Sequence, residues 1–130
     1  MPPPDSLNSI ASQILARATS TGLDVYDTEI RDTPAGPYLL LTGDGGLPLY
    51  QTLSGTPRKR LHTVQVMAVS GPGGTPSACR NIADQASVLL DGWAPTGGHP
   101  LRQVGAGPVL SGGPPGDVRH TITLTYQTRA

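Results

Sequence analysis

The chain has few large aromatic residues and a single cysteine. Phenylalanine is absent, Trp93 is the single tryptophan, and 17 glycines and 14 prolines are spread through 130 residues. This composition predicts a small core beneath many turns and loops. The lone Cys79 excludes a disulfide within the chain. No apolar run approaches the roughly 20 residues of a membrane helix, and no signal peptide pattern is present, so we expect a protein made in the cytoplasm with no membrane partner.

An excess of charge of one sign is also lacking. Nine basic residues balance nine acidic ones, so the formal net charge is zero. The chain therefore lacks the overall positive charge that is typical of a free nucleic-acid-binding protein, and any contact with DNA would have to involve a local group of basic residues. At this length we expect a single domain over residues 1–130, with enough buried surface to fold without metals or disulfides.

One strand and one helix are the clearest elements. Leu61 to Ser70 alternates side chains with a period of two, and both faces are partly apolar, which predicts a central strand. Gly71 to Gly74 then breaks the strand. Thr75 is suited to cap a helix, and Pro76 suits its first position. Apolar residues at helical spacing predict that this helix runs to Gly92.

The first half of the chain predicts a helix followed by strands. Leu7 to Thr19 carries apolar residues at helical spacing behind a proline stop. Leu23 to Arg31 mixes apolar and acidic residues, as a strand with one solvated face or a strand at a sheet edge does. Tyr38 to Thr42 is a short apolar strand, and Leu47 to Leu53 is an edge strand at most, because it contains Pro48.

The last third of the chain predicts two more strands. Leu101 to Leu110 is a weak strand, and its glycines indicate a bulge or bend. Ser111 to Gly116 is a flexible connection, and Val118 to Thr128 is a clean alternating strand whose polar face meets solvent or another subunit. The order of elements predicts an α+β fold, with two helices packed on one face of a mainly antiparallel sheet.

Two features could carry chemistry, and for both the structural interpretation is favoured. Gly71 to Thr75 precedes a helix and could hold an anion, but a phosphate loop needs a lysine where Thr75 stands. An ordinary turn between strand and helix explains the segment. Cys79 falls on the apolar stripe of the second helix, so burial is favoured over a role as nucleophile.

Histidines and acids give no better catalytic or metal site. His62, His99 and His120 lack metal-ligand spacing. An acidic cluster precedes the first turn, but strand alternation splits it between two faces, with Asp27 and Glu29 on one and Asp24 and Asp32 on the other. A solvated edge explains it. We therefore expect no enzyme, cofactor or metal.

The single run of like charge is Arg58, Lys59 and Arg60. It is either a solvated loop end or an interface. Repeated around the axis of a symmetric ring, three cations per subunit would form a positive belt that meets an acidic protein surface or DNA in a central channel. Further interface candidates are a glycine-rich loop and the start of the last strand. These residues are Gly43, Asp44, Gly45, Gly46 and Arg119.

Five stretches together resemble one family. They are the helix Leu7 to Thr19, "Val25-Tyr26 … Pro37-Tyr38-Leu39-Leu40", "Thr63-Val64-Gln65-Val66", "Val88-Leu89-Leu90-Asp91-Gly92-Trp93" and "Arg119-His120-Thr121-Ile122-Thr123-Leu124-Thr125-Tyr126". Over nearly the whole chain this layout is similar to the tail terminator proteins of long-tailed, non-contractile bacteriophages of actinobacteria. Head-side connectors of the same phage necks share its size and element order.

The resemblance implies a structural virion protein without an active site. Such a protein forms a homo-hexameric ring on the last ring of tail tube protein, ends tube polymerisation and offers a docking surface to the neck connectors of the head. Genomic DNA would pass through the channel without sequence-specific binding. The runner-up is a head-side connector. A small α+β anion- or ligand-binding domain, with the anion at Gly71 to Thr75, is the alternative from another class.

Overall fold

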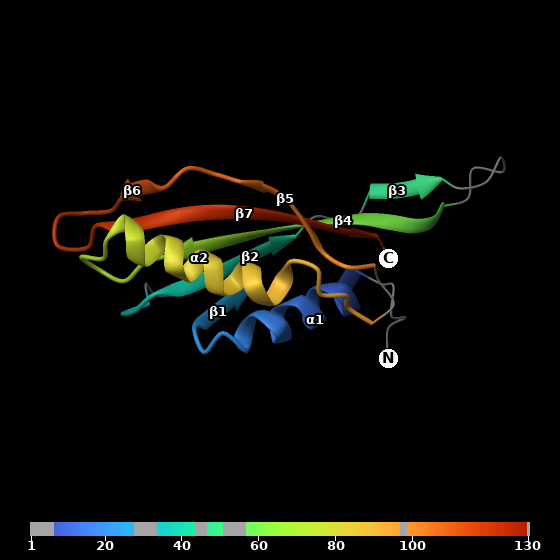
Figure 1. The fold of residues 1–130 in the computed structure, drawn as a ribbon, viewed down its shortest axis with the longest axis horizontal. Helices are drawn as coiled ribbons and strands as arrows, with labels where there is room; N and C mark the ends of the chain where they lie inside the picture. The colour runs from blue at the N-terminus through green and yellow to red at the C-terminus, as the bar shows by residue number, and fades with distance from the viewer. Residues whose placement is uncertain (1–6, 28–33, 44–46, 51–56, 97–98, 130) are drawn as a thin grey trace.

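The computed structural model describes residues 7–27, 34–43, 47–50, 57–96 and 99–129. Helices and strands follow one another as the sequence predicts for an α+β fold, which the structure confirms (Figure 1). The elements are α1 Leu7–Thr19, β1 Asp24–Asp27, β2 Tyr38–Gly43, β3 Leu47–Tyr50, β4 Pro57–Val69, α2 Pro76–Leu90, β5 Arg102–Ala106, β6 Leu110–Gly112 and β7 Arg119–Arg129.

The strands form one sheet in the order β1-β2-β4-β7-β5, with β3 added to β4 and β6 added to β7. Pairing is antiparallel throughout the described strands except between β1 and β2, which are parallel. The predicted central position of β4 is confirmed, and so is the edge position of β1. However, β4 begins at Pro57, four residues before the Leu61 that the sequence predicts.

The glycine-rich segment after β2 joins two strands that do not pair with each other. Both β2 and β3 pair with β4, β2 along Val64 to Val69 and β3 along Pro57 to Leu61. They therefore lie one after the other along the same side of β4. β3 and the first residues of β4 form a two-stranded extension of the sheet (Figure 1).

Both helices cover the same face of the sheet (Figure 1). Registers across the three central strands place Leu39, Ala68 and Ile122 in one row and Leu41, Val66 and Leu124 in the next. These side chains are buried against the helices, because alternate residues of a strand point to the same face. The helices contribute a second buried set. Its members are Ile14, Ala18, Cys79, Ile82, Ala83, Ala86 and Leu90.

Arg17 links the two helices. Its Nε donates a 2.9 Å hydrogen bond to the carbonyl of Leu89, and its guanidinium lies 5.6 Å from the ring centroid of Trp93. Trp93 in turn packs against the core. The single tryptophan therefore packs at the end of α2, with the guanidinium of Arg17 from α1 over its ring.

The second helix starts and stops where the sequence predicts. Thr75 has extended backbone angles, and its side chain accepts a 3.1 Å hydrogen bond from the amide of Ala78. Pro76 follows at the first helical position, and Gly92 takes a positive φ of 84° just after the helix. The Thr75 side chain satisfies a free backbone amide at the first turn, and the positive φ of Gly92 turns the chain away after the last turn.

Thr75→Ala is expected to lower the free energy of unfolding by about 1 kcal/mol, because the Ala78 amide loses its acceptor. Urea denaturation followed by circular dichroism measures this change. Thr75→Ser, which keeps the hydroxyl, is the matched control and should retain most of the stability. An equal loss in both variants would contradict a capping role.

The weak strand predicted for Leu101 to Leu110 is two short strands, β5 and β6, joined by an irregular segment. A shift of register between Gln103 and Gly105 interrupts the pairing of β5 with β7, which confirms the predicted bulge. The apolar and polar faces predicted for β7 are confirmed in the middle of the strand, since Ile122, Leu124 and Tyr126 are buried and the threonines between them are partly exposed. They are wrong at its start, where Val118 is exposed and Arg119 is buried.

Candidate interaction site

A two-stranded ribbon extends beyond the body of the sheet. The pairing of β4 with β7 ends at Leu61 opposite Arg129, whereas β4 continues to Pro57 and pairs there with β3. The backbone of Arg58, Lys59 and Arg60 lies in this ribbon (Figure 1). The predicted loop end is therefore a strand, and the basic run stands at one extremity of the molecule. Its role at an interface stays a prediction.

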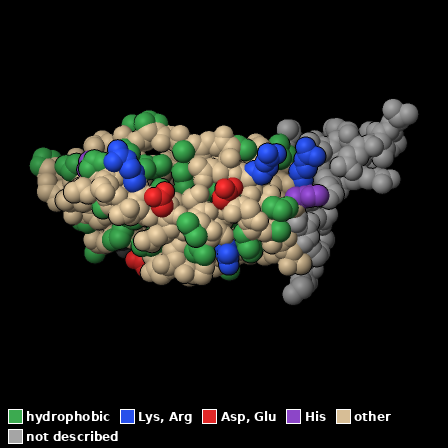
Figure 2. All heavy atoms as spheres, viewed as in Figure 1, with side chains coloured by type: hydrophobic (Ala, Val, Ile, Leu, Met, Phe, Trp, Pro, Cys, Tyr) green, Lys and Arg blue, Asp and Glu red, His purple; other side chains and the backbone are tan. Residues whose placement is uncertain are grey.

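More cationic side chains gather at the base of the ribbon. A cleft of about 540 Å³ lies there, and its described lining includes two arginines and a histidine but no carboxylate. Arg102 and Arg129 are both exposed. Figure 2 shows arginine and histidine side chains at this end, beside the residues whose placement is uncertain. A chain with zero net charge thus has a locally positive end.

Two hydrogen bonds, one of them from a side chain, hold the histidine-bearing segment against the end of β7. The amide of His99 donates to the carbonyl of Arg129 at 2.8 Å, and the hydroxyl of Thr128 donates to the carbonyl of His99. Sequence reasoning found the basic run but missed Arg102 and Arg129, because they are isolated in the sequence and become neighbours of the ribbon through strand pairing.

Of the predicted interface loop, Gly43 is the last residue of β2 and is exposed. Asp44, Gly45 and Gly46 lie outside the described residues. The loop therefore connects β2 to the first strand of the ribbon, and its predicted contact with another subunit stays a prediction.

Arg119, a further predicted interface residue, is buried within the chain. It is 7% exposed, and its Nε forms a 2.8 Å ion pair with Asp117. Its other nitrogens donate to the carbonyls of Pro34 and Gly36, and its guanidinium lies 5.8 Å from the ring centroid of Tyr38. The guanidinium thus fastens the segment before β2 to the start of β7.

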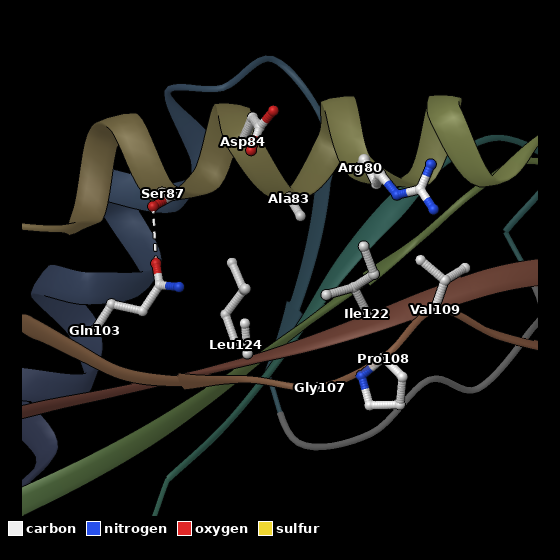
Figure 3. Close-up of a pocket in the computed structure, with 11 residues that line it drawn as sticks. Arg80, Ala83, Asp84, Ser87, Gln103, Gly107, Pro108, Val109, Ile122 and Leu124 are labelled. Atoms are coloured by element: carbon white, nitrogen blue, oxygen red, sulfur yellow. Dashed lines mark hydrogen bonds between the residues drawn. The ribbon is translucent and has the colours of Figure 1, made fainter.

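A second cleft of about 450 Å³ separates α2 from the β5–β6 edge (Figure 3). Ile122 and Leu124 line it from β7. Ser87 donates a 2.8 Å hydrogen bond to Gln103, which ties α2 to β5, and Arg80 and Asp84 stand on the helix side. The floor of this cleft is apolar, but its lining also contains the polar side chains of Arg80, Asp84, Ser87 and Gln103.

Backbone amides of the turn before α2 already donate hydrogen bonds within the chain. The Gly73 amide donates to the carbonyl of Val118 at 3.2 Å, and the Gly74 amide donates to that of Gly71 at 3.1 Å. In the first turn of the helix, the Ala78 amide donates to the Thr75 side chain and the Cys79 amide donates to the Thr75 carbonyl. An anion site needs such N–H groups to point at the ligand, so these contacts favour the turn over the anion site.

Cys79 is fully buried in α2, as the apolar stripe predicts. Its thiol faces the carbonyl of Ala68 at 3.5 Å. Burial raises the pKa of this thiol above its ordinary value of 9.0, against a smaller opposing effect of Arg80. A nucleophilic cysteine needs a lowered pKa and access, so the structure favours the structural role. Among the described residues no group of three or more His, Cys, Asp or Glu could hold a metal.

Stability is expected to fall as pH rises past 9.0. Burial raises the pKa of Cys79 above that ordinary value, and burial also raises the pKa of Tyr126 above 10.0, so the unfolded chain loses these protons first. The contribution of these two groups to the free energy of unfolding is therefore complete at pH values below their pKa in the unfolded chain, and it declines at higher pH. Urea unfolding on both sides of pH 9.0 measures the slope, and Cys79→Ala should make it shallower. An identical slope in this variant would show that the thiol does not contribute.

The acidic segment lies partly in β1. Asp24 and Asp27 are both exposed there, while Glu29 and Asp32 lie outside the described residues. Tyr26 of the same strand contacts Tyr38 edge to face, with ring centroids 5.8 Å apart. The exposed carboxylates are thus at a sheet edge, in agreement with the solvated edge that the sequence predicts.

In the described part of the chain, no helix is long and apolar enough to cross a membrane. Neither a protein-family model nor a curated protein sequence matches the chain. One solved structure aligns with 93% of this chain and 91% of its own, at a TM-score of 0.52 and 23% sequence identity. At this identity the likeness is one of fold, and it supports the α+β architecture described above.

Proposed function

We propose that the chain is a tail terminator of a long-tailed, non-contractile phage, a virion protein that caps the tail tube as a hexameric ring. The observation that carries the proposal is the β3–β4 ribbon, which leaves the sheet beyond Leu61 and contains Arg58, Lys59 and Arg60. A two-stranded ribbon is marginally stable alone. It therefore suits docking against a neighbouring subunit, the tube or the head.

The positive charge at this end of the molecule indicates that its docking partner is negatively charged. Arg102 and Arg129 at the base of the ribbon add to its three cations. In a closed ring these groups recur around the axis, which suits contact with acidic protein surfaces or with DNA phosphates during passage of the genome. Such contacts need no sequence recognition, because phosphates are the same at every base pair.

The anion-binding alternative has less support. It requires the turn Gly71–Thr75 to present free amides, and the amides of Gly73 and Gly74 donate within the chain. The head-side connector remains the competing assembly role, and it differs from the terminator in its partner: the connector binds the head, whereas the terminator binds tube ends.

The test is native mass spectrometry of the chain, alone and with the tail tube protein of the same phage, combined with electron microscopy of growing tubes. A terminator should form a hexamer, alone or at tube ends, and should stop tube growth. A ring that ignores tubes but binds DNA-filled heads would move the assignment to a connector. A stable monomer or dimer that ignores both and is stabilised by inorganic phosphate would support the ligand-binding domain.

A further inference from the structure

One side of β4 has no described partner beyond the end of β7. The last pair between these two strands joins Leu61 to Arg129, and β4 extends from there to Pro57. β3 pairs with this extension on the side that faces β2 in the body of the sheet. No described strand pairs with the extension on the opposite side. The described sheet therefore leaves one edge of the ribbon open to an added strand.

The open edge borders the cleft of about 540 Å³ at the base of the ribbon. Leu61 lines this cleft from β4, and Thr128 and Arg129 line it from β7. The cleft therefore lies where β7 ends and the ribbon continues beyond it (Figure 1). An added strand that continued the line of β7 along the ribbon would run across the cleft.

Hydrogen bonds within the chain hold the other wall of the cleft in place. His99 and Pro100 line this wall and belong to the segment between α2 and β5. Two backbone hydrogen bonds of 2.8 Å join Leu101 to the residues just after α2, and the side chain of Gln13 in α1 exchanges two hydrogen bonds with the backbone of Thr96. The cleft is thus formed before any partner arrives, as binding sites usually are.

The charge around the open edge is positive. The extension of β4 contains the basic run, residues 58–60, and Arg129 at its base is exposed. Asp91 offsets the charge of Arg102, since its carboxylate accepts a 3.1 Å hydrogen bond from the amide of Gln103. The cations available to a partner are therefore those of the ribbon and Arg129, and the described lining of the cleft contains no carboxylate.

An open strand edge beside positive charge suits an acidic peptide better than DNA. The edge offers backbone amides and carbonyls, which a peptide in extended conformation pairs with and a DNA duplex does not. Acidic side chains on that peptide would meet the basic run, which favours the correct partner. A third strand would also stabilise the ribbon, because two strands alone are marginally stable.

We infer that the open edge of β4 and the adjoining cleft bind an acidic, extended segment of a docking protein, which joins the sheet as a strand in line with β7. The site rests on the proposed function, which supplies the docking protein. It adds the chemistry of the segment that this protein presents and the way in which that segment binds.

Synthetic peptides test the requirement for acidic charge. The probe is Thr-Asp-Val-Glu-Val-Asp-Thr, blocked at both ends and fluorescently labelled, and its control is the neutral Thr-Asn-Val-Gln-Val-Asn-Thr. In fluorescence anisotropy titrations with the full chain, the acidic peptide is expected to bind about tenfold more tightly, because the control lacks three carboxylates. Equal affinity of the two peptides, or no saturable binding of the acidic one, would overturn the site.

Methylation of peptide backbone nitrogens tests strand addition. Successive amides of an extended peptide point to opposite edges, so pairing along one edge uses one alternate set of amides. Methylating that set in the acidic peptide should abolish binding, and methylating the other set should leave the affinity within about twofold. If the two methylated peptides bind equally, the peptide does not pair along a strand edge.

Charge reversal in the protein locates the site. Arg129→Glu is expected to weaken binding of the acidic peptide at least about threefold. Arg80→Glu, on the exposed side of α2, is the matched control and should bind the peptide as the unaltered chain does. Equal binding by both variants would place the peptide elsewhere, and a short DNA duplex that displaces the peptide and binds more tightly would indicate phosphate recognition instead. Circular dichroism checks the fold of each variant.

The outcomes for this site and for the proposed function are separable. A chain that binds the acidic peptide through the open edge but neither caps tubes nor joins heads would keep the site and lose the terminator role. Tube capping and head joining that both persist at a saturating concentration of the acidic peptide would keep the terminator role. They would also show that docking uses another surface, which overturns the site.

Discussion

Replacing Arg58, Lys59 and Arg60 together with alanine is expected to leave the fold intact and to weaken ring assembly, tube capping or head joining. The backbone of these residues lies beyond the last pair between β4 and β7, outside the core that the helices cover. Exposed charge pairs contribute about 0.2–1 kcal/mol each, so the loss of three lowers the affinity of each contact by roughly threefold to 150-fold. The fraction of capped tubes, counted by electron microscopy, measures the effect.

Two controls separate charge from shape. Arg58→Lys with Arg60→Lys keeps the charge of the ribbon, so it should retain capping if the attraction is simply Coulombic, and should lose it if planar guanidinium groups bind phosphates or carboxylates in pairs. Arg80→Ala removes one exposed cation from α2, away from the ribbon. Unchanged ring assembly, capping and virion yield in the triple alanine variant would contradict the proposed role of the ribbon.

Salt gives an independent measure of the same interaction. Contacts between exposed charges weaken as ionic strength rises, because mobile ions screen them. Capping by the unaltered chain should therefore decline with added salt, and capping by the triple alanine variant should decline less. Equal salt dependence in the two chains would assign the electrostatic part of binding to other residues, with Arg102 and Arg129 the next to be replaced.

The parts of the fold that were predictable from the sequence are those fixed by local chemistry. Thr75, Pro76 and Gly92 set the bounds of α2 through capping, a fixed φ and a positive φ, and each acts within a few residues. Alternation of apolar and polar residues with a period of two identified β4 and β7 and the buried face of β7. The pattern is readable because every second side chain of a strand points to the same face, and a buried face requires apolar residues.

The parts that were not predictable depend on partners distant in the chain. Parallel pairing of β1 with β2 and the alignment of β2 and β3 along one side of β4 are choices among strands, and the residues of each strand allow several. For the same reason only part of the positive end was predictable. The basic run is contiguous in the sequence, whereas Arg102 and Arg129 come close to it only because β5 pairs with β7.

Arg119 shows why charge at a strand end is ambiguous in a sequence. An arginine in an exposed position and one that fastens a loop look alike, and only the position of Pro34, Gly36 and Asp117 around it distinguishes them. Local alternation placed it on the polar face of β7. The segment before β2, distant in sequence, covers that position and makes the side chain buried.

Arg119→Ala is expected to lower the free energy of unfolding by about 2–4 kcal/mol, because it leaves two carbonyls and a carboxylate without their donor in a partly dehydrated place. The side chain of Asp117 is 36% exposed, so water compensates part of its loss, and Asp117→Asn should cost less than about 1 kcal/mol. Arg119→Lys keeps the charge but cannot reach all three acceptors, so its stability should fall between these two. Urea unfolding measures all three.

Assembly measurements on the same variants decide between the two roles of Arg119. If the guanidinium fastens Pro34 and Gly36 to β7, then Arg119→Lys should lose stability and keep ring assembly wherever the chain is folded. An interface residue would behave in the opposite way, with stability unchanged and assembly lost. Because the side chain is 9% exposed within one chain, little of it remains for a partner, and the first outcome is the expected one.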